Sequence, residues 1–293
     1  MLLIEKLQHL DHLSSGQKAV ANFLLEQKEA ISDMTIKEIA SRTYTSPATL
    51  IRLAKNLGYD GFEHLKNDFL MEESYLNQHF TSIDANFPFQ KNENMMSIAG
   101  KITTLAKETM SDTLSLIKYQ DLTAAISIIE NADKIHLSAI SFPLIYGRDF
   151  QLKMRRIGKY VELTDLVGEQ LFTAPIIQNR DCAIIISYSG ETTIPRDMMT
   201  LYKKKGIPII AITSMGNNFI REHATISLTI TTREKLYSKI AGYSSEFSIK
   251  LILDILYSCY FRNHYNEFLQ QKTELSKSAE PGRKSTSDIL REN

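Results

Sequence analysis

The feature that most constrains the fold is a series of short, continuously apolar segments that alternate with helical stretches from residue 134 onward. Segments such as Ala183–Ile186 are apolar at every position, which predicts strands buried on both faces, as in parallel sheets covered by helices. We expect strands at Lys134–Ser138, Lys159–Leu163, Cys182–Ser187, Pro208–Thr213 and Thr225–Ile230, and helices at residues 145–156, 168–178, 194–205, 217–222 and 245–268. This part of the chain is therefore expected to be an α/β three-layer domain with a five-stranded parallel sheet.

A hydroxyl-rich loop directly follows the expected strand Cys182–Ser187 and leads into a helix with Pro195 in its first turn. Backbone N–H groups of such a loop, the hydroxyls beside them and the positive end of the helix dipole can bind a phosphate without a lysine or a metal. Open α/β sheets also bind their ligands beyond the carboxyl ends of the strands, which is where this loop lies. The alternative is a helix capped by serine and threonine that binds nothing. The residues of the loop are Ser187, Tyr188, Ser189, Gly190, Glu191, Thr192 and Thr193.

Residues from about 120 to 265 resemble the sugar isomerase (SIS) domain. The resemblance rests on the Ser-x-Ser-Gly-Glu-Thr loop, on Pro208–Thr213 and on the strand at Thr225–Ile230. It implies a domain that holds the phosphate of a phosphosugar. The matching positions would make Ser187, Ser189 and Thr192 phosphate ligands, with Gly190 and Glu191 shaping the loop.

The turn after the first expected strand departs from the SIS pattern, which has a glycine-rich turn ending in serine. Here Ile140 and Phe142 occupy positions that are small in the family. Ser141, and less directly Ser138, could still donate a hydroxyl to a ligand, so the pocket is either reshaped for another ligand or narrowed or lost. Glu246 is a further candidate for effector contact, because the resemblance brings its segment near the ligand of a neighbouring subunit.

Two short helices joined by a tight turn are expected near the start of the chain. Thr35 and Glu38 have the spacing of a capping box, and the helix that they begin ends near Arg42. Ser46 suits the N-cap of a second helix, which runs to Leu57 and stops at Gly58. This order of elements indicates a helix-turn-helix within an all-α bundle.

The second helix is apolar on one face and polar on the other. Its apolar stripe packs inward, and its other side can offer hydrogen-bond donors to base edges and cations to phosphates, as a helix in the major groove must. The alternative is a helical bundle that serves packing or dimerisation. The candidate DNA-binding residues are Thr45, Ser46, Thr49, Arg52 and Lys55.

Charge supports DNA binding only locally. The chain has 34 basic and 34 acidic residues, and residues 1–75 contain eight basic residues against eleven acidic ones. From Thr43 to Tyr59, however, there is no acidic residue, while Arg52 and Lys55 are present. A local excess of positive charge is what contact with phosphates requires.

The segment from Leu13 to Lys66 resembles the N-terminal domain of RpiR-family transcriptional regulators. The resemblance rests on the spacing of Ile39-Ala40, Ser46, Thr49, Arg52-Leu53-Ala54-Lys55, Leu57-Gly58 and Gly61-Phe62. It implies that Ser46–Leu57 is a recognition helix and that the helix beginning at Gly61-Phe62 packs behind it. An RpiR-type domain followed by a SIS domain is the arrangement of sugar-responsive regulators of carbohydrate catabolism.

The expected organisation is a DNA-binding domain at residues 1–76, a linker at 77–96, a SIS-type effector-binding and oligomerisation domain at 97–270, and a disordered tail at 271–293. A helical stretch is expected from Met95 to about Glu130. The apolar runs have the length of strands, so no membrane span is expected, and two cysteines indicate a reducing cytoplasm rather than a disulfide framework. No spacing of side chains indicates a metal, and no cofactor is expected.

Three functions are compatible with these patterns. The preferred one is a homodimeric or homotetrameric transcriptional regulator that binds a palindromic operator in double-stranded DNA and senses a phosphosugar. The second is a phosphosugar isomerase or lyase, which needs a general base that no paired arrangement of side chains indicates. The third is a regulator whose SIS domain only dimerises and binds no ligand.

Overall fold

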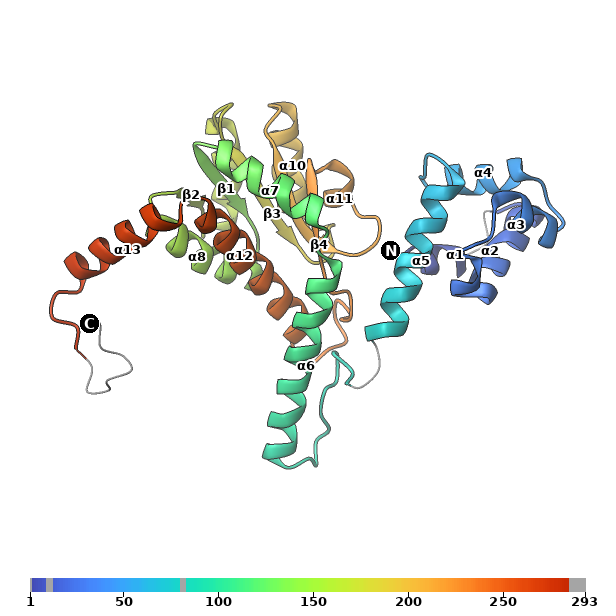
Figure 1. Ribbon diagram of the computed structural model, residues 1–293, viewed down its shortest axis with the longest axis horizontal. Helices are drawn as coiled ribbons and strands as arrows, with labels where there is room; N and C mark the ends of the chain where they lie inside the picture. The colour runs from blue at the N-terminus through green and yellow to red at the C-terminus, as the bar shows by residue number, and fades with distance from the viewer. Residues whose placement is uncertain (1, 9–12, 80–82, 285–293) are drawn as a thin grey trace.

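A computed structural model describes residues 2–8, 13–79 and 83–284 of the chain. It shows two parts, a helical bundle at the N-terminus and an α/β domain (Figure 1). We refer to the bundle as the head. Its helix α5 (Phe62–His79) lies nearest to the α/β domain, and α3 and α4 lie beyond it (Figure 1).

The head packs its helices around one apolar core. Its elements are α1 (Leu3–Gln8), α2 (Ser15–Gln27), a short 3-10 helix (Lys28–Ile31), α3 (Ile36–Arg42), α4 (Pro47–Asn56) and α5. The core contains fully buried side chains from three helices: Leu24 of α2, Leu50 and Leu53 of α4, and Phe69 of α5. The capping box expected at the start of α3 is present, because Thr35 and Glu38 bond each other's backbone N–H groups. The helical N-terminal region is thereby confirmed.

The α/β domain is built on one sheet of five parallel strands in the order β2-β1-β3-β4-β5. The strands are β1 (Lys134–Ser138), β2 (Tyr160–Leu163), β3 (Cys182–Ser187), β4 (Ile209–Ser214) and β5 (Ile226–Ile230). All residues of β3 and β4 are buried, as their unbroken apolar character predicts. The expected five-stranded parallel sheet is confirmed.

Helices cover both faces of the sheet because alternate residues of each strand point to opposite sides. Ile184 and Ile186 pack with helices α7 (Tyr119–Asn131), α8 (Phe142–Arg155) and α12 (Tyr243–Asn263). Ala183 and Ile185 pack on the other face with α10 (Thr193–Lys204) and the short helix α11 (Phe219–His223). The three-layer architecture follows directly from this alternation.

Several expected helices are interrupted or shorter. The stretch expected from Met95 to Glu130 is two helices, α6 (Met95–Leu116) and α7, because Ile117 and Lys118 have extended backbone. The last long helix is broken at His264 into α12 and α13 (Tyr265–Ala279). Residues 168–178 form only short turns of 3-10 helix and α-helix α9 (Gln170–Thr173).

The C-terminal segment and the linker also differ from expectation. Helix α13 extends to Ala279, so the expectation of a tail without regular structure is wrong for residues 271–279. Residues 285–293 of that tail lie outside the described part of the chain. At the linker, α5 continues to His79 and α6 begins at Met95, and both helices therefore extend into the segment expected to be irregular.

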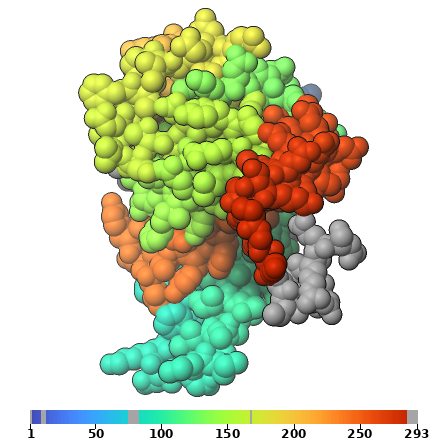
Figure 2. Space-filling model, turned by 90° about the vertical axis from the view of Figure 1, so that its left-hand side faces the viewer, coloured from blue at the N-terminus to red at the C-terminus, as the bar shows by residue number. Residues whose placement is uncertain are grey.

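The described part of the linker lies against the loop of residues 231–242. Asn86 accepts a hydrogen bond from the N–H of Lys235 at 2.7 Å, and its carbonyl accepts one from the N–H of Ile240 at 2.9 Å. Figure 2 shows this loop above the first turns of α6, which project beyond the rest of the α/β domain. The large apolar side chains here are exposed, among them Met95, Met96 and Tyr237.

Candidate functional site

The candidate DNA-binding surface of the head lies on α4. Leu50, Leu53 and Ala54 are completely buried and fix the orientation of the helix. Arg52 and Lys55 are exposed on the opposite side. The α/β domain therefore leaves the polar face of α4 uncovered.

The turn between α3 and α4 is held by its own hydroxyl groups. Thr43 Oγ1 donates to the carbonyl of Ile39 at 2.8 Å and lies 2.8 Å from Thr45 Oγ1. Between them Tyr44 is 98% exposed and has a φ of 51°, in the left-handed region. This arrangement presents an aromatic side chain beside the polar face of α4, which the spacing of the motif does not predict.

The polar residues at the start of α4 form a continuous row. Ser46 Oγ lies 3.1 Å from Thr49 Oγ1, and Arg52 Nη2 donates to Thr49 Oγ1 at 3.5 Å. The start of α2 lies close to this row, since a Cβ on Gly16 would be 3.3 Å from Thr49 Cγ2. All five residues expected to contact DNA thus lie on or beside one surface.

The loop after β3 has a shape that only glycine permits. Gly190 has a φ of +67°, and its N–H donates to Ser187 Oγ at 3.1 Å. A Cβ at this position would lie 1.9 Å from Asn218 Oδ1. The loop therefore turns tightly against Asn218, which comes from the segment after β4.

Three hydroxyls of this loop converge at the start of α10. Ser187 Oγ lies 2.8 Å from Thr192 Oγ1, and Ser189 Oγ lies 3.5 Å from the same atom. Thr192 is the N-cap residue of α10, yet its side chain makes no capping hydrogen bond. The positive end of the helix dipole and the hydroxyls thus face the same place, an arrangement suited to an anion.

Glu191 points out of the cluster of hydroxyls. Its carboxylate accepts a hydrogen bond from the N–H of Phe219 at 2.8 Å and forms an ion pair with Arg196 at 3.1 Å. It fastens the loop to the first residue of α11. This geometry agrees with a role in shaping the loop.

The two serines after β1 have different surroundings. Ser138 is 1% exposed, and its hydroxyl donates to Gln170 Oε1 at 3.1 Å. Ser141 is exposed and has a φ of 62° at the N-cap position of α8. Phe142 is 55% exposed and so is not packed into the core. Ser141 is therefore the serine of this turn that a ligand can reach.

Glu246 lies in the first turn of α12 and accepts a hydrogen bond from Tyr146 Oη at 2.8 Å. Burial and the neighbouring carboxylate raise the pKa of Tyr146 to about 12. Beside them Glu234 binds the N–H groups of Ser244 and Ser245. Nothing in the local sequence indicates that Gln170 bonds Ser138 or that Asn218 lies against Gly190, because the two members of each pair are far apart along the chain. Glu234 likewise binds residues ten and eleven positions further along.

No group of three or more metal-binding side chains occurs within residues 2–8, 13–79 and 83–284. Over the same residues, no helix is both long and apolar enough to cross a membrane.

The fold and the two sites define a helix-turn-helix protein with a SIS-type α/β domain. The helix-turn-helix domain of the rpiR family matches residues 1–75, and the SIS domain matches residues 128–253. The chain belongs to the RpiR family of HTH-type transcriptional regulators, as the sequence resemblance indicates.

Relatives and solved structures agree with this assignment. An HTH-type transcriptional regulator of Caldanaerobacter subterraneus subsp. tengcongensis is 24% identical over 87% of this chain and 88% of its own length. The HTH-type transcriptional regulator YbbH of Bacillus subtilis is 26% identical over 88% of both chains. The structure of Vibrio vulnificus NanR complexed with ManNAc-6P covers 96% of this chain and 100% of its own, with 21% identity and a TM-score of 0.61, and so shares the fold.

Proposed function

We propose that this regulator binds operator DNA through the exposed face of α4 and that its SIS domain senses a phosphosugar, so that it controls genes of carbohydrate metabolism. The observation that carries the proposal is the convergence of the Ser187, Ser189 and Thr192 hydroxyls at the start of α10. The NanR structure supports the choice of ligand class, because that protein shares the fold and was solved with ManNAc-6P.

In this proposal the phosphate is held by Ser187, Ser189, Thr192 and the N–H groups of the loop. Ser141 and Glu246 lie at the starts of α8 and α12, and we assign them to the sugar part of the ligand. Ser138 and Glu191 keep the turns in shape, because their side chains are already bonded to Gln170, Phe219 and Arg196.

On the DNA side, Thr45, Ser46 and Thr49 reach base edges or the sugar–phosphate backbone, and Arg52 and Lys55 contact phosphates. We propose that residues 1–76 form the DNA-binding unit, residues 77–96 the linker, and residues 97–270 the effector and oligomerisation unit. Two copies of the chain would place two heads on a palindromic operator. Met95, Met96 and Tyr237 are 87%, 79% and 93% exposed, which supports an interface between copies at this end of the α/β domain.

We propose binding without turnover. An aldose–ketose isomerase needs a general base near the sugar. Glu191 is paired with Arg196, and His223 stacks on Phe219 with ring centroids 4.1 Å apart. Glu246 accepts a hydrogen bond from Tyr146. Incubation with fructose 6-phosphate should therefore yield no isomerised product, and turnover that disappears in Glu246→Ala would contradict this part of the proposal.

A thermal-shift experiment with a panel of phosphosugars tests the effector site, with each sugar lacking its phosphate as the control. A ligand present at 100 times its Kd stabilises the folded protein by about 2.7 kcal/mol, which is a measurable shift. Ser189→Ala and Thr192→Val should remove the stabilisation. If no phosphosugar stabilises the wild-type protein, the SIS domain only dimerises and the sensing proposal fails.

Gel-shift measurements with the DNA that flanks the gene test the other site. Binding should prefer particular sequences and weaken as salt rises, because counterions are released from the phosphates. Binding that lacks either property would refute the assignment of α4 as the recognition helix.

A further inference from the structure

The short helix α11 is attached by its first residues to the loop of residues 187–193, which we call the phosphate loop. The N–H of Ile220 donates to the carbonyl of Gly190 at 3.2 Å, and the N–H of Phe219 donates to Glu191 Oε1 at 2.8 Å. Asn218 caps α11 by accepting from the N–H of Arg221 at 3.0 Å, and the same oxygen occupies the space next to Gly190. A displacement of the loop at Gly190 must therefore move the start of α11.

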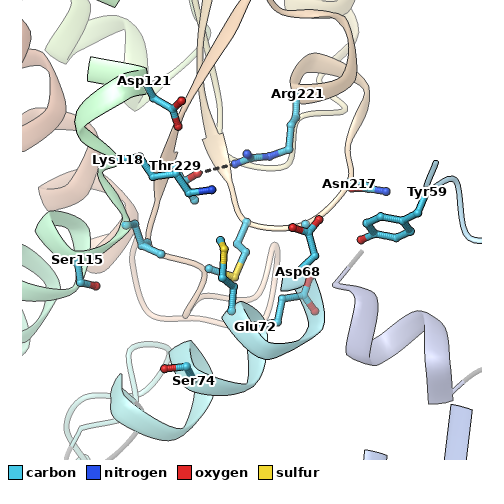
Figure 3. A pocket seen from close by; sticks show the side chains of 14 residues that line it. Tyr59, Asp68, Glu72, Ser74, Ser115, Lys118, Asp121, Asn217, Arg221 and Thr229 are labelled. Atoms are coloured by element: carbon cyan, nitrogen blue, oxygen red, sulfur yellow. Dashed lines mark hydrogen bonds between the residues drawn. The ribbon is translucent and has the colours of Figure 1, made fainter. Parts of the chain in front are cut away.

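The other side of α11 faces the head through Arg221. Its guanidinium donates to the carbonyl of Ser214 at 3.1 Å and to Thr229 Oγ1 at 2.8 Å. Its Nε is buried and has no hydrogen-bond partner among the described residues. Arg221 lines a cavity of about 330 Å³ between the α/β domain and the head, and Asp68 of α5 lines the same cavity (Figure 3).

Charges of both signs meet in this cavity. Asp68 and Glu72 come from α5 of the head, and Lys118 and Asp121 come from the start of α7 (Figure 3). Burial lowers the pKa of Arg221, whereas Asp68 and Asp121 act in the opposite direction and favour its charged form. The positive charge of Arg221 is thus stabilised from both parts of the protein.

Asp68 is also connected to the proposed recognition helix α4, through Tyr59. It interacts with the hydroxyl of Tyr59, which is 7% exposed and lines the same cavity. Tyr59 follows α4 after Leu57 and Gly58, and its N–H donates to the carbonyl of Ala54 in that helix at 2.9 Å. A series of interactions therefore runs from Gly190 through α11 to Arg221, across the cavity to Asp68 by attraction between the two charges, and through Tyr59 to α4.

We propose that α11 couples the two sites, with Arg221 and Asp68 as opposite charges across the cavity through which occupancy of the phosphate loop changes the position of the head. The inference rests on the proposed function, since it describes how a phosphosugar in that loop would alter DNA binding. A ligand shifts such an equilibrium only if it binds one arrangement more tightly than the other, and the effect is reciprocal between the two sites. Coupling of this kind changes affinity by roughly 5- to 150-fold in typical cases.

Hydrogen–deuterium exchange on the full chain tests the coupling, with fructose 6-phosphate and inorganic phosphate as probes. A probe should slow exchange in residues 189–192 and also change exchange in α11 and α5. In Asp68→Asn the effect on the loop should remain and the effect on α5 should disappear. Glu63→Gln makes the same chemical change on the same helix but outside the cavity, so it should behave like the wild type.

The DNA affinity gives a second measurement. The ratio of operator affinities with and without the probe should fall toward one in Asp68→Asn and in Arg221→Gln, each of which removes one of the two charges, and should stay unchanged in Glu63→Gln. If a probe protects the loop while α11 and α5 are unaffected, or if both variants keep the wild-type ratio, the coupling is refuted and the proposed function stands. If neither probe protects the loop of the wild-type protein and no phosphosugar of the thermal-shift panel stabilises it, the proposed function and the coupling both fail.

Discussion

Replacing Gly190 by alanine gives the strictest test of the phosphate loop. The residue has a φ of +67°, which costs an L-amino acid about 1–2 kcal/mol. The new Cβ would also lie 1.9 Å from Asn218 Oδ1, so Asn218 must move. Because that oxygen caps α11, its displacement costs about 0.5–2 kcal/mol more.

The two effects together predict a loss of about 1.5–4 kcal/mol in the stability of the loop conformation. If about 2–3 kcal/mol of this loss is subtracted from the free energy of ligand binding, the affinity for a phosphosugar falls roughly 30- to 150-fold. Gly206→Ala is the matched control, since Gly206 has a φ of +70° and no atom within 4 Å of a new Cβ. It should lose only about 1–2 kcal/mol of stability and leave the affinity unchanged.

The assay combines isothermal titration of the phosphosugar found in the thermal-shift panel with urea unfolding of both variants. Gly190→Ala should bind much more weakly than Gly206→Ala at equal protein concentration. Equal affinity and equal stability of the two variants would show that the contact with Asn218 does not shape the site, and the structural reasoning about the loop would then be wrong.

Three further predictions concern the head. Arg52→Ala should weaken operator binding at all sequences and reduce the slope of log affinity against log salt by about 1, measured by gel shift in a salt series. Leu53→Ala should destabilise the head by about 2–5 kcal/mol in urea unfolding followed by circular dichroism, because Leu53 is completely buried. Ile51→Ala, on the same helix but 40% exposed, should change stability by less than about 0.5 kcal/mol, and equal losses in the two would contradict the packing of α4. Hydrogen bonds from Thr35 lower the pKa of Glu38 below its usual 4.5, so the stability that the ionised carboxylate adds over Glu38→Gln is present above that pH and is lost as the pH falls through the lowered pKa. Unfolding curves at pH 7 and pH 3 measure this difference, which should be smaller at the lower pH.

The sequence predicts those elements whose signal is local. The capping box at Thr35, the stop at Gly58 and the buried strands β3 and β4 each depend on residues within a few positions of one another. The same holds for the loop at Gly190, whose turn follows a strand and precedes a helix. Local propensity and burial favour one structure at these places, so the prediction and the fold agree.

The differences arise where distant residues decide the structure. The helix ends between α6 and α7 at Ile117, where the sequence has no proline or glycine that would predict a break. Ser138 is a residue type that can bind a ligand, but its hydroxyl donates a hydrogen bond to Gln170 instead, 32 residues away. The partners of Arg221 in the cavity come from the head and from α7. A single sequence contains no periodicity that reports such contacts.

The acidic residue in the phosphate loop follows from the same geometry. A carboxylate facing a bound phosphate would repel it, so the position of Glu191 conflicts with phosphate binding when the sequence is considered alone. In the structure the carboxylate is turned toward the N–H of Phe219 and the guanidinium of Arg196, 3.1 Å away. Arg196 in turn lies over the ring of Phe219, 4.4 Å from its centroid. Glu191 is thereby neutralised, and its carboxylate also joins the loop to α11, beside the hydrogen bond from Ile220 to Gly190. In the proposed site the carboxylate therefore does not face the phosphate.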